Sequence, residues 1–243
     1  MSEIGPGVLE QLRRYDTPTV CNLIELFDVR PRAVGYMDAR IRACFPDLPP
    51  MVGFAATATF RASGLPRGSD VYSSTEEQVE RFEDLSGPPV VIFQDLDDPS
   101  VAATFGEVMC TIYRAFGAVG LIASGTGRDL DQIRALDFPV FANGVVCSHG
   151  YPQIPEVQVP VRVGGLLVRP DDLLHGDRNG ITSIPREIAA ELVDIADEFV
   201  AAEEIVLDAL REGSSSFAGL RQARAESKSR IGELRARVSR EST

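Results

Sequence analysis

The chain has 243 residues, of which 44% are hydrophobic and 25% charged, the composition of an ordinary globular protein. Its formal net charge of -12 disfavours nucleic acid as a partner, because such binders need a basic surface. No apolar run reaches the roughly 18 to 20 residues of a membrane span, and the first residues lack the pattern of a signal peptide. We therefore expect a cytoplasmic protein that does not enter a membrane.

Two short helices are expected near the N-terminus. Residues 6–15 form the first. Thr17 is the expected N-cap of the second, with Pro18 at its first position. Residues 30–50 are rich in Pro and Arg and indicate a connection with one short strand at 40–43.

The middle of the chain alternates between strands and helices. Strands are predicted at 52–62, 90–93, 118–123 and 140–146, and helices at 74–85, 105–116 and 130–136. Ser74 and Glu77 have the spacing of a capping box, which would open the first of these helices. The alternation predicts one α/β domain with a mixed sheet.

The pattern changes to short strands and tight turns over residues 158–185. Gly164-Gly165 is typical of a hairpin turn, and residues 169–172 of a β-turn. Helical periodicity then returns at 187–210 and at 217–238, an extended pair that follows the α/β domain.

These patterns divide the chain into an α/β domain, residues 1–185, which we expect to be catalytic, and a C-terminal helical extension, residues 186–243, whose long helices we expect to pack in an oligomer. The segment from Gly219 to Thr243 has seven basic and three acidic residues, a local net charge of +4. It could bind RNA or a partner. The favoured interpretation is a solvated helix that packs on the acidic body or on a neighbouring subunit.

The strongest candidate for a chemical site is the loop from Ser124 to Asp129, with the sequence SGTGRD. It follows a predicted buried strand, and ligands of α/β sheets bind at the carboxyl ends of strands. Arg128 offers a planar fork for a carboxylate or an enolate oxygen, and Asp129 offers hard oxygens suited to Mg²⁺ or Mn²⁺. The same two residues could instead form a salt bridge at a helix start, with Asp129 as the N-cap.

Gly106-Glu107 is the second candidate, because backbone N–H groups at a helix start attract anions. The alternative is a helix that begins with a favourable acidic residue. The loops at Gly106 and at Arg128 belong to adjacent strand–helix units, so both could open onto the same edge of the sheet.

The third candidate is the polar turn from His175 to Gly180, although a polar turn punctuated by glycine in a β region is often only a turn. The only other histidine is His149, and neither lies in a zinc-binding spacing. The four cysteines form no CxxC pair, which argues against a disulfide framework and predicts buried free thiols.

Lys228 is the only lysine of the chain, and it lies in a polar C-terminal segment. Schiff-base chemistry needs a lysine desolvated in a pocket, and a P-loop needs one in its glycine-rich motif. The sequence therefore disfavours class I aldolases, pyridoxal-phosphate enzymes and Walker-type NTPases.

Together these elements resemble one family, the regulator-of-ribonuclease-activity A-like group, which includes 4-hydroxy-4-methyl-2-oxoglutarate / 4-carboxy-4-hydroxy-2-oxoadipate aldolases. The resemblance is carried by Gly106-Glu107, residues 120–129, residues 138–142, residues 170–173, the polar turn at His175 and Ile184-Pro185. Residues 17–20 and 52–57 also look like its N-terminal motifs. It covers about residues 10 to 210.

The resemblance implies a swivelling β/β/α-type domain, assembled as a homo-oligomer (a trimer or a hexamer) with sites between subunits. It implies a class II lyase that depends on Mg²⁺ or Mn²⁺ and cleaves a 4-hydroxy-2-oxo acid to pyruvate. Decarboxylation of oxaloacetate passes through the same enolate and is a further activity of this kind.

The resemblance also implies roles for particular residues. Asp129 would bind the cation, mostly through water. Arg128 would stabilise the enolate, and Glu107 would lie near the metal waters. The substrate carboxylate would meet the backbone of Gly106, Glu107, Val108 and Met109. A catalytic glutamate would come from a neighbour's C-terminal helix, with Glu203 or Glu204 as the candidate.

Two departures from the family pattern concern the substrate. Ser124 stands where many members have Asp or Asn, and Glu107 stands where characterised aldolases often have Asp. A non-enzymatic regulator that binds a ribonuclease is the alternative function. The combination of Glu107, Arg128 and Asp129 favours the enzyme, because a pure protein binder has no physical need for it. A methyltransferase of quinone precursors has no support, because no complete glycine-rich nucleotide loop is present.

Overall fold

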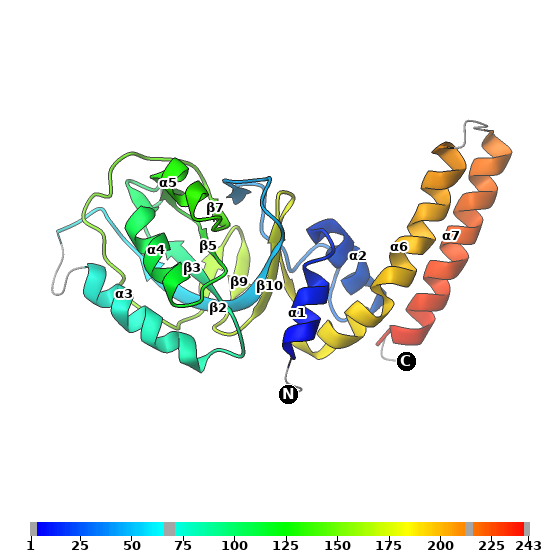
Figure 1. Cartoon of the computed structure of the whole chain (residues 1–243), viewed down its shortest axis with the longest axis horizontal. Coiled ribbons are helices and arrows are strands. Elements are labelled where there is room, and N and C mark those ends of the chain that lie inside the picture. Colours follow the sequence, from blue (N-terminus) through cyan, green and yellow to red (C-terminus); the bar gives the residue numbers. More distant parts are fainter. Residues whose placement is uncertain (1–3, 66–70, 212–215, 241–243) are drawn as a thin grey trace.

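The structure is a computed structural model that describes residues 4–65, 71–211 and 216–240 (Figure 1). Its helices are α1 (Pro6–Leu12), α2 (Thr17–Leu26), α3 (Val71–Glu80), α4 (Glu107–Ala115), α5 (Leu130–Ala135), α6 (Ala189–Arg211) and α7 (Phe217–Val238). Its strands are β1 (Arg42–Ala43), β2 (Met51–Phe60), β3 (Pro89–Asp95), β4 (Ala103–Phe105), β5 (Gly120–Ala123), β6 (Thr126–Gly127), β7 (Val140–Ala142), β8 (Val161–Val163), β9 (Leu166–Val168), β10 (Leu173–Asp177) and β11 (Gly180–Ile184).

Seven of these strands form one mixed sheet in the order β1-β7-β5-β3-β2-β10-β11. The four central strands, β7, β5, β3 and β2, run parallel, and the outer strands pair antiparallel. The carboxyl ends of the central strands therefore meet at one edge. A second pair, β4 with β6, lies at this edge and is also parallel. The prediction of a mixed α/β sheet is confirmed.

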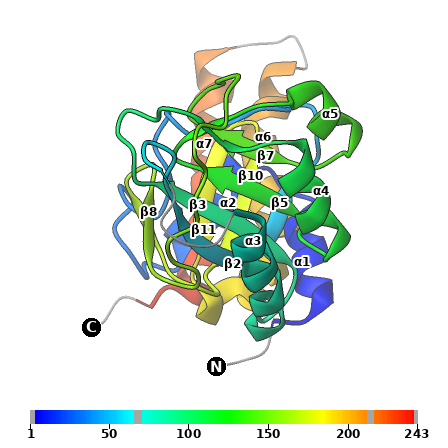
Figure 2. The same cartoon turned by 90° about the vertical axis from the view of Figure 1, so that its left-hand side faces the viewer.

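Alternating side chains of the central strands divide the core between two faces. Val91 and Phe93 of β3 pack in the cluster that contains side chains of α4 and α5. Val90 and Ile92 point the other way and pack in a cluster with the β8–β9 hairpin. Helices, sheet and hairpin thus form three layers, with α3, α4 and α5 together on one side of the sheet (Figure 2).

A third core cluster joins α1, α2 and α6 to the edge of the sheet. Leu192 and Phe199 of α6 share this cluster with Val52 and Phe54 of β2. Beyond it, the rest of α6 and most of α7 extend from the body as a helical hairpin (Figure 1). No helix among the described residues is long and apolar enough to cross a membrane.

The basic C-terminal helix packs against acidic residues of the body, as the favoured interpretation predicted. Arg235 pairs with Asp28 at 2.7 Å, and Arg237 pairs with Glu198 of α6 at 2.8 Å. The bounds of α7 agree with the predicted range 217–238, because Ser216 caps its first turn by accepting a hydrogen bond from the amide of Gly219.

Two predicted helix starts are wrong. Asp16, not Thr17, is the N-cap of α2, and its carboxylate accepts a hydrogen bond from the amide of Thr19 at 2.8 Å. Helix α3 begins at Val71, so Ser74 lies inside it and caps nothing. The polar residues there serve tertiary packing instead. Gln78 is buried and accepts a hydrogen bond from the Tyr113 hydroxyl at 2.6 Å.

The predicted strand at 140–146 is shorter than expected, because β7 ends at Ala142. Gly144 has a φ of +151°, which redirects the chain, and Val145 then pairs with Gly127. The prediction of buried free thiols holds for Cys110 and is wrong for Cys147, which is exposed.

His175 lies within the core and not in an open turn. Its ring nitrogens lie 2.9 Å from the Thr17 hydroxyl and 3.1 Å from the carbonyl oxygen of Leu12, so it joins β10 to the N-terminal helices. Burial lowers the pKa of this imidazole. His175 is therefore a structural element of the fold.

We expect His175 to make stability depend on pH. Because its pKa is lowered on folding, the unfolded chain binds the proton more readily, and stability falls as the pH drops below the ordinary histidine range near ~6.5. Urea denaturation should show a lower free energy of unfolding at pH 5.5 than at pH 7.5. The loss from this one group is at most about 1.4 kcal/mol per pH unit.

His175→Gln should reduce this pH dependence, whereas His149→Gln, at the exposed histidine, should leave it as in the wild type. A His175→Gln variant that keeps the full wild-type slope would assign the effect to other groups.

Candidate active site

The short β4–β6 pair brings the two main candidate loops together. Phe105 pairs with Gly127, and its carbonyl oxygen accepts a hydrogen bond from the amide of Arg128 at 3.1 Å. The Phe105 ring lies so close beneath Gly127 that an added Cβ would stand 2.4 Å from it. The first residues of α4 and α5 therefore lie side by side at the carboxyl edge of the sheet.

Asp129 occupies the N-cap position of α5 but does not cap this helix. Its backbone is left-handed, with a φ of +57°, and its side chain forms no cap hydrogen bond to α5. Instead Oδ2 accepts a hydrogen bond from the amide of Glu107, the first residue of α4, at 3.1 Å. The carboxylate thus faces the neighbouring helix, which a simple helix start does not require.

Arg128 contributes the cation of this cluster. Its Nε lies 3.5 Å from Asp129 Oδ2, and both side chains are about one-third exposed. Gly106 packs against both, since a Cβ there would stand 2.6 Å from Asp129 Oδ2 and 3.1 Å from Arg128 Nε. The salt bridge weighed from the sequence is present, and it lies in a crowded corner where a larger residue at position 106 would displace the Asp129 and Arg128 side chains.

A cavity of about 160 Å³ opens beside this corner. Its lining includes residues that the sequence predicted (Gly106, Val108, Met109 and Arg128) and others that it did not (Ala103, Thr104, Phe105, His149 and Pro152). The missed residues lie in β4 and in a loop without periodicity. In the sequence, the glycines near these residues were the only feature that could have indicated a ligand site.

The carboxylate of Asp129 fits a weakly held hard cation better than a caged one. Among the described residues no group of three or more His, Cys, Asp or Glu side chains could hold a metal ion. Mg²⁺ usually takes one or two carboxylates and completes its shell with water and substrate oxygens. Asp129 alone would be a ligand of that kind, with the rest of the shell from water and substrate.

Ser124 takes no part in the Arg128 cavity. Its hydroxyl accepts a hydrogen bond from the amide of Asp95 at 2.8 Å and so ties the end of β5 to the end of β3. The serine at this departure from the family pattern therefore holds two strand ends together and does not contact the Arg128 cavity.

Glu203 and Glu204 lie on α6, across the molecule from α4 and α5 within one chain (Figure 1). Burial, together with the nearby charge of Asp16, raises the pKa of Glu203. Glu204 forms an ion pair with Arg211 on the same helix. One chain alone therefore does not bring either glutamate to Arg128.

The comparisons with known proteins agree with this architecture. The family model described as "RraA-like: Aldolase/RraA" matches residues 17–182, and the chain belongs to this family. A Halalkalibacterium halodurans protein named "Putative 4-hydroxy-4-methyl-2-oxoglutarate aldolase" is 31% identical over 102 residues, which cover 42% of this chain and 49% of that protein. The chain spans about half the length of the first curated relatives it matches.

Two solved structures are similar in fold. An uncharacterized protein from Pseudomonas syringae pv. tomato has a TM-score of 0.71 at 22% identity, and the match covers 92% of this chain and 95% of that one. Streptomyces coelicolor RraAS2, described as an unusual member of the RNase ES inhibitor RraA protein family, has a TM-score of 0.66 at 22% identity over 84% of this chain and 97% of that one.

Proposed function

We propose that the protein is a divalent-metal-dependent lyase of the class II pyruvate aldolase type, acting on a 4-hydroxy-2-oxo acid or on oxaloacetate. The observation that carries the proposal is the position of the Asp129 carboxylate, which faces away from its own helix and lies beside Arg128, a residue that lines a cavity. The name of the Halalkalibacterium relative and the family match support the same reaction class.

In this proposal Asp129 would hold Mg²⁺ or Mn²⁺, and the bound ion would polarise the 2-oxo group. The amides of the first turn of α4, at Val108 and Met109, lack acceptors inside the helix and would bind the substrate carboxylate. The guanidinium of Arg128 would stabilise the negative charge that develops on the oxygen of the pyruvate enolate. Gly106 keeps this corner narrow enough for all three groups to reach one small substrate.

Removal of the metal is the first test. Pyruvate release should stop when the cation is removed with EDTA and return when Mg²⁺ or Mn²⁺ is added.

Asp129→Asn should lower metal-dependent turnover strongly while the circular dichroism spectrum stays unchanged, since the side chain keeps its size and loses its charge. Full activity after confirmed metal removal would contradict the class II mechanism.

Arg128 should matter most in the chemical step, because its charge is needed when the enolate forms. We expect Arg128→Ala to lower kcat on the order of 100- to 1000-fold. Arg128→Lys should recover only part of this, because an ammonium group cannot form the two-point contact. Steady-state kinetics of the two variants, with oxaloacetate and with a 4-hydroxy-2-oxo acid as substrates, would measure both effects. A normal kcat with a raised KM would restrict Arg128 to substrate binding.

We further propose a trimer or a hexamer in which α6 of one subunit supplies Glu203 or Glu204 to the Arg128 cavity of another. The projecting hairpin supports this, because it exposes Val200, Leu207 and Leu210 on one protruding helix.

Light scattering should give a multiple of 26.3 kDa, the mass of one chain. Subunit mixing tests the shared site. Arg128→Ala and the double variant Glu203→Gln/Glu204→Gln should each be inactive, and part of the activity should return after the two are unfolded together and reassembled. A stable monomer, or no recovery in mixed oligomers, would argue against a shared site.

A further inference from the structure

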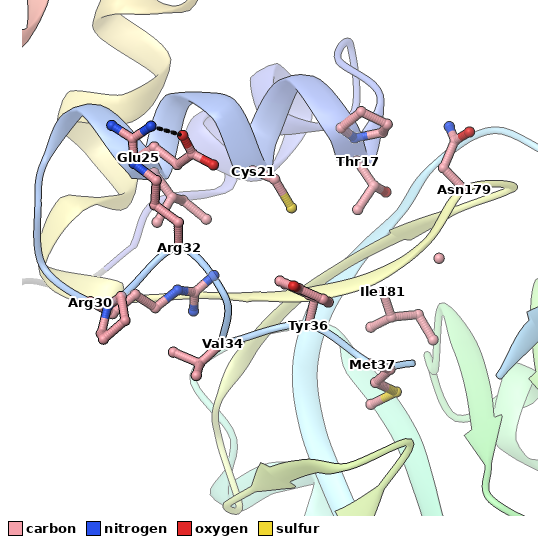
Figure 3. A pocket seen from close by; sticks show the side chains of 14 residues that line it. Thr17, Cys21, Glu25, Arg30, Arg32, Val34, Tyr36, Met37, Asn179 and Ile181 are labelled. Atoms are coloured by element: carbon pink, nitrogen blue, oxygen red, sulfur yellow. Dashed lines mark ion pairs between the residues drawn. The ribbon is translucent and has the colours of Figure 1, made fainter. Parts of the chain in front are cut away.

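A second cavity lies away from the Arg128 corner, where α2 contacts β11. Its volume is about 340 Å³, within the range of small-ligand pockets. It is lined by α2, by the connection from Arg30 to Met37 and by the first residues of β11 (Figure 3). No residue of the proposed lyase site contributes to it.

Arg30 is the feature that distinguishes this cavity. Its guanidinium is held in place by two hydrogen bonds, from Nη1 to the Ser183 hydroxyl at 3.0 Å and from Nη2 to the Thr182 hydroxyl at 3.1 Å. Both hydroxyls donate in turn to the carbonyl oxygen of Gly35. Gly35 has a φ of +95° and packs directly against the guanidinium, where a Cβ would stand 2.0 Å from Cζ.

Both partners of Arg30 are uncharged. None of the ion pairs found among the described residues includes this guanidinium, although Arg30 is partly buried and burial lowers its pKa. A desolvated cation without a counter-ion is costly, and a protein normally offsets that cost with an opposite charge. Here two hydrogen bonds hold the guanidinium, and Glu25, the carboxylate in the cavity lining, pairs with Arg32 instead.

The other charged groups near the cavity are already paired. Arg32 forms an ion pair with Glu25 at 3.1 Å, which Figure 3 shows as a dashed line. The Asp177 carboxylate accepts hydrogen bonds from the amides of Thr17 and Asn179 and from the Asn179 side chain. The unmatched charge of this region is therefore that of Arg30.

The rest of the lining is largely apolar. Val34, Tyr36, Met37 and Ile181 surround the space between Arg30 and Asn179, as the labelled side chains show (Figure 3). An occupant that matches these walls has an anionic head at one end and a compact apolar body at the other.

We propose that this cavity binds a small organic anion, a carboxylate or a phosphate monoester with an apolar body, whose head pairs with Arg30. The ligand class follows from the unpaired guanidinium and the apolar walls together. The inference is independent of the proposed lyase reaction, since the two cavities share no residue.

Calorimetric titration with three probes of similar size tests the charge requirement. Benzoate and phenyl phosphate represent the two head groups, and benzyl alcohol is the neutral control. We expect at least one anion to bind at least tenfold more tightly than the alcohol, and the better of the two identifies the head group. Arg30→Met should weaken that anion at least tenfold. Arg32→Met, the matched control whose cation is already paired, should change it less than threefold.

The position of the bound anion can be read from cysteine labelling. Cys21 lines this cavity, whereas Cys147 is exposed elsewhere. Burial raises the pKa of the Cys21 thiol, so labelling with iodoacetamide is followed near pH 9 by peptide mass spectrometry. The tighter anion should slow labelling of Cys21 at least fivefold and leave Cys147 unchanged. Arg128→Ala should bind the anion as the wild type does, which separates this site from the lyase site.

Several results would overturn the proposal. These are no binding of either anion at millimolar concentration, equal binding to Arg30→Met, and binding without protection of Cys21. A Cys21 that reacts only after the oligomer is dissociated would show that a second copy covers the cavity. If Arg30→Met fails to fold, Cys21→Asp replaces it. This variant puts a carboxylate beside Arg30, so it should abolish anion binding, and retained binding would contradict the proposal.

Discussion

The two-residue pairing of β4 with β6 is the contact on which the candidate site depends. It places the Phe105 ring under Gly127 and the amide of Arg128 against the Phe105 carbonyl. Two helices that are separate in the sequence therefore begin at one point. The cation of Arg128, the anion of Asp129 and the free amides of α4 meet there because the backbones meet. A side chain at Gly127 would meet the Phe105 ring at 2.4 Å, so the ring would have to move.

The large sheet supports this corner through the alternation of its side chains. Because neighbouring residues of β3 point to opposite faces, one short strand contributes to two separate clusters of the core. The helices on one face are thereby fixed at the carboxyl edge, and the β8–β9 hairpin closes the other face. The family's β/β/α layering follows from this division, and the site is held by rigid elements on both sides.

Much of the fold could be predicted from the sequence, because the hydrophobic periodicity within a long segment indicates its secondary structure. The bounds of α7 are one example, set by a serine cap at one end. The start of α3 was mispredicted because Ser74 and Glu77 have the spacing of a capping box, although both lie inside the helix. Arg128 and Asp129 were found from their place after a buried strand. Their contact with α4 could not be predicted, because it depends on the pairing of β4 with the two-residue strand β6. A strand that short shows no alternating pattern in the sequence. His149 and the Arg30 cavity depend on tertiary contacts alone.

Two ion pairs hold the base of the C-terminal hairpin. Arg235 of α7 pairs with Asp28, which follows α2, and Arg237 of α7 pairs with Glu198 of α6. Arginine stays charged at any physiological pH, and the Arg237 guanidinium holds the pKa of Glu198 below its usual range. Proton concentration therefore does not govern this attachment near neutrality. Dissolved ions weaken these two pairs, because partly exposed pairs are screened as ionic strength rises. The buried side chain of Leu234 also joins α7 to the core cluster that contains α6, and this apolar contact is not screened by salt.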